Sequence, residues 1–195
     1  KSIRENKIYN NEPLLGHIIK ESISSDRFEL LNKPKYADIF IICTPTPVKF
    51  EGVNGIPDLS YVYSAIDSII EYLQPRNTLI IESTIPVGTT SKIKKYIISK
   101  NKELSNMYFA HCPERVLPGN IIFEIKNNAR IVGGVTKKDN EKIASFFKSF
   151  VNGSIIETSS ENAEMCKLAE NSFRDVNIAF ANELSIICQD NKINV

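Results

Sequence analysis

The sequence predicts an α/β fold, in which a mostly parallel sheet is followed by one long helix. Short apolar runs with strand character alternate with stretches of helical period. Each of the first runs stops at a polar or proline-rich loop, and the last 30 or so residues keep a helical period without a Gly or Pro. Alternation of strand and helix is typical of a layered α/β protein with a largely parallel sheet.

Five short runs are predicted strands, because they are too short for core helices and several are rich in β-branched residues. The first two read as parallel strands buried on both faces. The runs cover residues 36–43, 77–83, 106–110, 130–134 and 154–157. One predicted helix starts at Glu12-Pro13, before the first strand. Three others lie between the strands and cover about 58–73, 89–100 and 137–150.

Residues 161–188 are predicted to form a single helix about 40 Å long, more than a small domain needs for its own core. Thr158, Ser159 and Ser160 are possible N-caps. Apolar side chains recur at steps of three and four, which predicts one buried face. That face comprises Met165, Ala169, Phe173, Val176, Ala179, Phe180, Leu184 and Ile187.

Lys167, Asn171 and Arg174 fall in a narrow stripe on the opposite side of this helix, at about 100° per residue. The spacing allows two interpretations. The stripe is either a solvated polar edge, which is the common fate of charged helix positions, or one wall of a site.

Composition narrows the classes of partner. With 195 residues, 42% of them hydrophobic, the chain fits one domain or one domain plus part of another. A net charge of +1 and scattered Lys and Arg give no indication of nucleic acid binding. No apolar run approaches the ~20 residues of a membrane span, so no membrane partner is predicted. Two histidines and no Cys-x-x-Cys pair give little support for a metal.

The four cysteines stand in unrelated contexts, which favours free thiols in a reducing cytoplasm over a disulfide framework. They are Cys43, Cys112, Cys166 and Cys188.

Three polar loops follow predicted strands, at residues 44–47, 83–89 and 111–119. Ligands of parallel sheets bind beyond the carboxyl ends of the strands. Hydroxyls and free backbone N–H groups near helix N-termini suit phosphate and ribose oxygens, so the three loops together favour a nucleotide crevice. Each loop alone reads equally well as an ordinary turn.

Glu114 is the best acid/base candidate, because it lies past a strand end in a loop stiffened by Pro113 and Pro118. The bland alternative is an ion pair with a Lys or Arg. The neighbouring pair His111 and Cys112 does not predict a thiolate–imidazole site, since adjacent residues of an extended segment point in opposite directions.

Four segments carry a resemblance to a known family: CTPTP at 43–47, ESTIPVGT at 82–89, AHCPERVLPG at 110–119 and AEMCKLAENSFRDVNIAFANELS at 163–185. With them, nearly the whole chain from Glu12 onward resembles the nucleotide-sugar 6-dehydrogenases. The forms of the last two segments resemble the branch that acts on N-acetylated sugars.

The resemblance implies a Rossmann-like NAD-binding domain and a two-step oxidation. The C6 alcohol of a UDP-N-acetylhexosamine, foremost UDP-N-acetyl-D-mannosamine, would become a carboxylate through a cysteine-bound thiohemiacetal and thioester. It also implies a homodimer through the 161–190 helix.

The resemblance also implies a role for individual side chains. Glu114 would position the hydrolytic water, Lys167 would steady the developing oxyanion, and Asn171 would share that task or hold the water. The residues implied at NAD are Thr44, Thr46 and Thr84, and those at the substrate are Arg115, Val116, Lys167, Asn171 and Arg174.

The expected organisation is a C-terminal part of the NAD domain over 1–160 and a long central helix over 161–195, which begins the linking and dimerisation domain. No Gly-x-Gly-x-x-Gly occurs in the chain. We therefore expect the family's glycine-rich loop before residue 1 and its catalytic cysteine beyond Val195, and no turnover by residues 1–195 alone.

Three other interpretations stay open at this point. The chain could belong to a UDP-N-acetylglucosamine 6-dehydrogenase, to a non-catalytic nucleotide-binding or dimerisation module, or to a different NAD-dependent hydroxyacid dehydrogenase.

Overall fold

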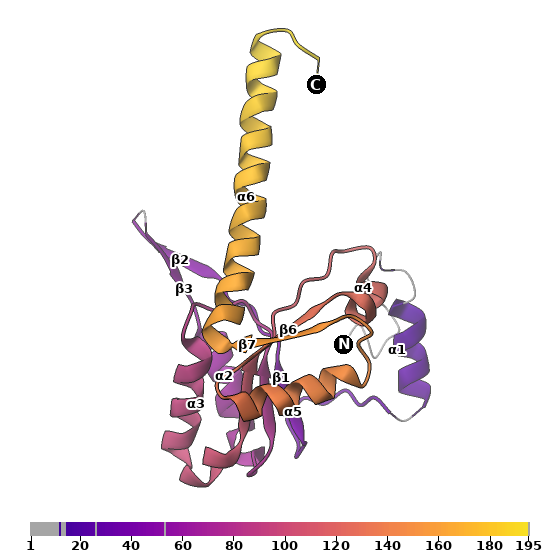
Figure 1. The fold of residues 1–195 in the computed structure, drawn as a ribbon, viewed down its shortest axis with the longest axis vertical. Helices are drawn as coiled ribbons and strands as arrows, with labels where there is room; N and C mark the ends of the chain where they lie inside the picture. The colour runs from indigo at the N-terminus through magenta and orange to yellow at the C-terminus, as the bar shows by residue number, and fades with distance from the viewer. Residues whose placement is uncertain (1–11, 13–14, 26, 53, 195) are drawn as a thin grey trace.

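The central element of the computed structural model is a five-stranded sheet in the order β1-β4-β5-β6-β7 (Figure 1). The structure describes residues 12, 15–25, 27–52 and 54–194. All strand pairs of this sheet are parallel except β5–β6, which confirms the predicted mostly parallel sheet. The strands are β1 Ile39–Ile42, β4 Thr78–Ile81, β5 Tyr108–His111, β6 Arg130–Gly134 and β7 Ile155–Ser159.

Helices pack on the sheet through two clusters of buried apolar side chains. One cluster joins β1, β4 and β5 to α2 (Ser60–Ile69) and α3 (Thr89–Lys100), and the other joins β4, β5 and β6 to α5 (Lys137–Lys148). Helices α3 and α5 match their predicted ranges closely, whereas the helix predicted over about 58–73 is α2 followed by a 3₁₀ turn, Ile70–Tyr72. A capping box formed by Thr136 and Asp139 fixes the start of α5.

The sequence did not predict several short elements. No strand was predicted between the run 36–43 and the helix 58–73, but Val48–Glu51 (β2) and Asn54–Pro57 (β3) pair as an antiparallel hairpin. Gly52 allows its tight turn with a φ of +64°. A seven-residue helix, α4 (Ile121–Asn127), and the 3₁₀ turn Lys102–Asn106 were also missed.

The first predicted helix is present, and the burial of the first strand differs from its prediction. Helix α1 covers Leu15–Ser24, and the predicted start at Pro13 lies outside the described residues. Strand β1 was expected to be buried on both faces, which is wrong, since Ile41 is 43% exposed. The reason is that β1 is an edge strand of the described sheet, and its buried residues Phe40 and Ile42 face the α2 and α3 cluster.

The predicted long helix is α6, Ser160–Asp190, whose 31 residues extend about 46 Å. The Ser159 side chain caps it by accepting a hydrogen bond from the backbone N–H of Asn162 at 3.2 Å. Figure 1 shows α6 leaving the sheet after its first turns and projecting away from the body of the protein. None of the helices in the described ranges is long and apolar enough to cross a membrane.

The predicted buried face of α6 is not buried in this chain. Only Ser160, Ala163 and Glu164 are buried, all in its first two turns. Six apolar side chains of that face are 45–73% exposed: Met165, Phe173, Val176, Phe180, Leu184 and Ile187. The helical period was read correctly, but the described part of the chain supplies no surface to cover it.

Helix α6 approaches β6 closely at Gly133. A Cβ at this position would lie 2.4 Å from the Cβ of Ala163 and 2.7 Å from the backbone O of Ser159. Backbone atoms cannot rotate out of the way as a side chain can, so only glycine allows this contact.

We predict that Gly133→Ala in the full-length protein lowers the free energy of unfolding by about 1–3 kcal/mol, because it overpacks the α6–β6 contact. Denaturant unfolding measures the change. Gly16→Ala in α1 is the matched control, since its Cβ would meet nothing within 4 Å. Equal stability of the two variants would show that the α6–β6 contact yields without cost.

Candidate functional site

Three loops meet at the carboxyl ends of the adjacent parallel strands β1, β4 and β5, as the sequence predicted. They enclose a cavity of about 380 Å³, here called the loop cavity. Helix α6 contributes one side chain, that of Lys167. The lining residues are Cys43, Thr44, Pro45, Thr46, Glu82, Ser83, Thr84, Glu114, Val116 and Lys167.

Ser83 fastens the first two loops together. Its buried hydroxyl accepts a hydrogen bond from the backbone N–H of Thr44 at 2.7 Å and lies 2.8 Å from the Thr44 carbonyl oxygen. The hydroxyls of Thr46 and Thr84 are on half-buried residues, and in the described part of the chain neither has a hydrogen-bond partner. Such hydroxyls can bind the ribose or phosphate oxygens of a nucleotide.

Three backbone N–H groups at the start of α3, those of Gly88, Thr89 and Thr90, already have partners within the chain, which corrects part of the prediction for this edge. The carboxylate of Glu164, completely buried in α6, accepts hydrogen bonds from the backbone N–H groups of Gly88 and Thr90 and from the Thr90 hydroxyl. The helix terminus therefore already holds an anion. Around this loop, the hydroxyls remain as ligand donors.

Glu114 lies at the floor of the loop cavity as a fixed carboxylate. Its Oε1 accepts hydrogen bonds from the backbone N–H groups of Arg115 (2.7 Å) and Val116 (2.8 Å), and its Oε2 accepts one from Arg130 (2.8 Å). Burial on its own would raise the pKa of Glu114, but Arg130 and the two backbone donors outweigh it and hold this pKa below the ordinary value. The Glu114 carboxylate thus forms an ion pair with Arg130, the alternative weighed from the sequence, and it also lines the loop cavity.

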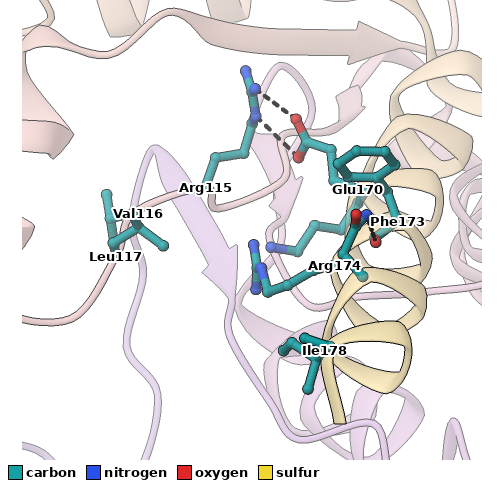
Figure 2. A pocket seen from close by; sticks show the side chains of 10 residues that line it. Arg115, Val116, Leu117, Glu170, Phe173, Arg174 and Ile178 are labelled. Carbon is teal, nitrogen blue, oxygen red and sulfur yellow. Dashed lines mark hydrogen bonds and ion pairs between the residues drawn. The ribbon is translucent and has the colours of Figure 1, made fainter. Parts of the chain in front are cut away.

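A second cavity of about 620 Å³, here called the helix cavity, lies between the 115–117 loop segment and α6 (Figure 2). It shares Val116 and Lys167 with the loop cavity. Arg115 forms a two-pronged ion pair with Glu170, with N···O distances of 3.1 and 2.5 Å. The lining residues are Arg115, Val116, Leu117, Lys167, Glu170, Phe173, Arg174, Asn177, Ile178 and Ala181.

The predicted stripe on α6 is thus part of a cavity wall at two of its three positions. Lys167 and Arg174 line the helix cavity, and the Lys167 ammonium donates a hydrogen bond to the backbone carbonyl of Glu114. Asn171 is half-buried one turn beyond Lys167, and the lining of neither cavity includes it.

Four charged residues of this region were not recognised from the sequence: Glu82, Arg130, Glu164 and Glu170. Glu82 and Glu170 stand inside recognised motifs, beside Ser83 and Asn171, so their position was a usable signal. Arg130 begins a strand whose direction the sequence does not reveal, and Glu164 is on the face of α6 that packs on the body of the protein.

Comparison with known proteins agrees with this arrangement. Residues 1–151 match the sequence profile of the UDP-glucose/GDP-mannose dehydrogenase family, NAD binding domain, and residues 161–195 match the central domain of the same family. The chain belongs to the UDP-glucose/GDP-mannose dehydrogenase family.

Individual members of this dehydrogenase family are similar over the whole chain. The UDP-N-acetyl-D-mannosamine dehydrogenase of Methanocaldococcus jannaschii is 46% identical over 100% of this chain and 45% of its own length. The NDP-N-acetyl-D-galactosaminuronic acid dehydrogenase of Ralstonia nicotianae is 40% identical over 100% of this chain and 47% of its own length.

A solved structure shows the same fold. The UDP-N-acetyl-mannosamine dehydrogenase Cap5O of Staphylococcus aureus superposes with a TM-score of 0.87 and 41% identity over 99% of this chain and 47% of that chain. The present chain spans about half the length of the family members it matches.

The neighbouring residues His111 and Cys112 are both buried. Cys112 belongs to the cluster under α5, where burial raises the pKa of its thiol. Neither ring nitrogen of His111 has a partner of hydrogen-bond geometry within the described residues. Burial lowers the pKa of His111 to about 4; the backbone of Ile81 offsets this in part, and the Lys167 charge adds to it.

We predict that His111 makes stability sensitive to acid. Its pKa falls from 6.5 to about 4 on folding, so between these values the unfolded chain binds more protons, and stability drops as the pH falls. The loss is at most about 1.4 kcal/mol per pH unit. His111→Leu, which has no proton to bind, should show a shallower decline between pH 6.5 and 4 in denaturant unfolding. Parallel declines for both proteins would contradict the assignment.

Proposed function

We propose that the full-length protein is an NAD-dependent 6-dehydrogenase that oxidises the C6 alcohol of UDP-N-acetyl-D-mannosamine to the uronate. The observation that carries the proposal is the meeting of two cavities at Lys167 and Val116. A hydride transfer needs a cofactor and a substrate side by side, and one cavity is available for each. Two relatives that are 46% and 44% identical are named UDP-N-acetyl-D-mannosamine dehydrogenase.

The loop cavity is the proposed cofactor side. Its half-buried hydroxyls at Thr44, Thr46 and Thr84 fit the ribose and phosphate oxygens of NAD. When bound, NAD would accept the hydride at its nicotinamide ring. The Thr44 hydroxyl lies 3.5 Å from that of Ser83. Because Ser83 ties the two loops to each other, the three threonines keep a fixed spacing.

The helix cavity is the proposed substrate side. Arg115, Lys167 and Arg174 bring three positive charges to it, against one carboxylate at Glu170. A diphosphate carries the charge and the acceptor oxygens that such a set binds. Val116 and Phe173 give the same cavity an apolar wall for the base or the sugar ring.

Lys167 lines both cavities, and the reacting carbon of the substrate would lie next to it. We propose that its ammonium stabilises the negative charge that develops on the C6 oxygen. Asn171, one turn along, is proposed to share this task or to hold a water. Glu114 would position the water of the hydrolytic step by accepting a hydrogen bond from it. Its lowered pKa makes it a weak base, so this role fits better than proton abstraction.

The covalent step of the proposed reaction needs a cysteine from outside residues 1–195. Burial and the charge of Glu82 raise the pKa of Cys43 to about 12, and Cys112 is completely buried. Neither thiol is suited to attack an aldehyde. Cys166 and Cys188 lie on α6, and the lining of neither cavity includes them. We accordingly propose that residues 1–160 belong to the NAD domain and that 161–195 begin the domain that links it to the remaining part of the site.

The exposed apolar face of α6 supports a homodimer. Side chains such as Phe173, Val176, Phe180 and Leu184 remain uncovered along a projecting helix. Such a face is costly to leave in water and suits a matching helix of a second copy.

We predict that the full-length protein reduces NAD in the presence of UDP-N-acetyl-D-mannosamine. We also predict that Lys167→Ala lowers kcat on the order of 100- to 1,000-fold, because it removes the positive charge beside the developing oxyanion. NADH absorbance, measured across a panel with UDP-N-acetylglucosamine and UDP-glucose, identifies the substrate. Lys138→Ala, an exposed residue of α5, is the control. A preference for the N-acetylglucosamine epimer would change the substrate, whereas no activity with any UDP-sugar would favour a non-catalytic module. Near-normal turnover of Lys167→Ala would remove Lys167 from the mechanism.

We predict that Phe180→Glu weakens the dimer, because it puts a charge on the proposed contact face. Light scattering coupled to gel filtration should show a shift toward monomer. Phe123→Glu, at an exposed phenylalanine of α4, should keep the wild-type mass. A wild-type monomer, or an unchanged Phe180→Glu dimer, would exclude this face as the interface.

A further inference from the structure

We propose that Arg130 is a positioning residue for Glu114: it fixes the orientation of the carboxylate and keeps it charged, so that one acceptor position remains for a water. The inference rests on the proposed function for its chemistry. Its structural part concerns Glu114 alone and can be tested without turnover.

The antiparallel pairing of β5 and β6 places Arg130 opposite Glu114. In the observed register, Ala110 pairs with Gly134 and His111 with Gly133. Continuing this register for three residues brings Glu114 opposite Arg130. The first residue of β6 therefore lies at the edge where β1, β4 and β5 end. A parallel β6 would have put its last residue there instead.

Arg130 is held on every side. It is 7% exposed, its guanidinium lies 5.0 Å from the ring centroid of Phe147, and its backbone N–H donates to the carbonyl of Ser154 at 2.9 Å. A guanidinium stacked on a buried ring has few alternative positions. Its hydrogen bond to Glu114 therefore fixes where the carboxylate lies.

The contacts of Glu114 leave limited room for further partners. A carboxylate offers about four acceptor positions. Three are filled, by the backbone N–H groups of Arg115 and Val116 and by Arg130. Because Glu114 also borders the loop cavity, the remaining position is available to a water there.

Arg130 also acts on the pKa of two neighbouring carboxylates, those of Glu114 and Glu82. Its Nη1 is 2.8 Å from Glu114, and its Nη2 is 3.8 Å from Glu82, to which the Cys43 thiol donates a hydrogen bond. Arg130 lowers the pKa of both carboxylates, but burial outweighs it at Glu82, whose pKa is raised, and not at Glu114, whose pKa is lowered. The shorter contact to Glu114 therefore stabilises the ionised form of Glu114 more than that of Glu82.

Other charged groups around this pair come from several elements. Lys167 of α6 donates to the Glu114 backbone carbonyl, and Arg115 supplies a backbone N–H, while its guanidinium pairs with Glu170. Glu124 of α4 accepts from the backbone N–H of Leu117. Among the described residues, Arg130 is the one cationic side chain bonded to the Glu114 carboxylate.

The test compares Arg130→Lys and Arg130→Met in the full-length protein. Methionine removes the charge, and lysine keeps it but loses the planar fork. With ¹³C-labelled glutamate carboxyls, and the Glu114 signal assigned by Glu114→Gln, NMR titration should show the Glu114 midpoint at higher pH in Arg130→Met and closer to wild type in Arg130→Lys. Steady-state kinetics gives the second readout. In both variants kcat should fall on the order of 100-fold because the carboxylate is misplaced, and the KM for the sugar nucleotide should stay unchanged. The acid limb of the plot of kcat against pH should shift to higher pH together with the NMR midpoint of Glu114.

Loss of a buried ion-pair partner can prevent folding, and Arg130→Lys then decides the question alone. Ile143→Val, in the same cluster as Phe147 but without a charge, controls for lost stability and should keep both the titration and the pH profile. Folded Arg130 variants with a wild-type Glu114 midpoint and wild-type kcat would overturn the inference. If the wild type oxidises no UDP-sugar, the proposed function fails, while the NMR titration still decides the Arg130–Glu114 relation.

Discussion

The buried carboxylate of Glu164 is the contact on which the site depends. It accepts three hydrogen bonds from Gly88 and Thr90 and so joins the beginning of α6 to the beginning of α3. Hydrogen bonds to a charged group contribute about 1.5–3 kcal/mol each. Lys167 follows Glu164 by one turn of helix, so this anchor sets where its ammonium lies relative to the loops after β4 and β5. The close contact of Ala163 with Gly133 fixes the same turn against β6.

Much of this architecture could be predicted because it follows from local pattern. The apolar runs at 77–83 and 130–134 identify β4 and β6, and the helical period identifies α3, α5 and α6 within a few residues. The three loops were placed at one edge by a general rule of parallel sheets, and the loop cavity confirms that placement. The roles of Thr46, Thr84 and Lys167 stay predictions.

What the sequence did not reveal depends on long-range contacts. Arg130 reaches Glu114 only because β6 is antiparallel to β5, and the strand pattern of Arg130–Gly134 is the same in either direction. Nothing in the sequence pattern of α6 indicates that Glu164 binds the start of another helix, yet its carboxylate accepts hydrogen bonds from Gly88 and Thr90 at the start of α3. The apolar period of α6 correctly indicates a surface that avoids water, but a period does not say whether the same chain or another molecule covers it.

The uneven anchoring of α6 has a mechanical consequence. Its first turns are fixed to the body of the protein, and the remaining length has no cover in the described chain. A force on the projecting part of α6 is therefore transmitted along the helix to its anchored first turns, and Lys167 lies next to them. The position of Lys167 in the two cavities is thus coupled, through one continuous helix, to whatever binds the projecting part.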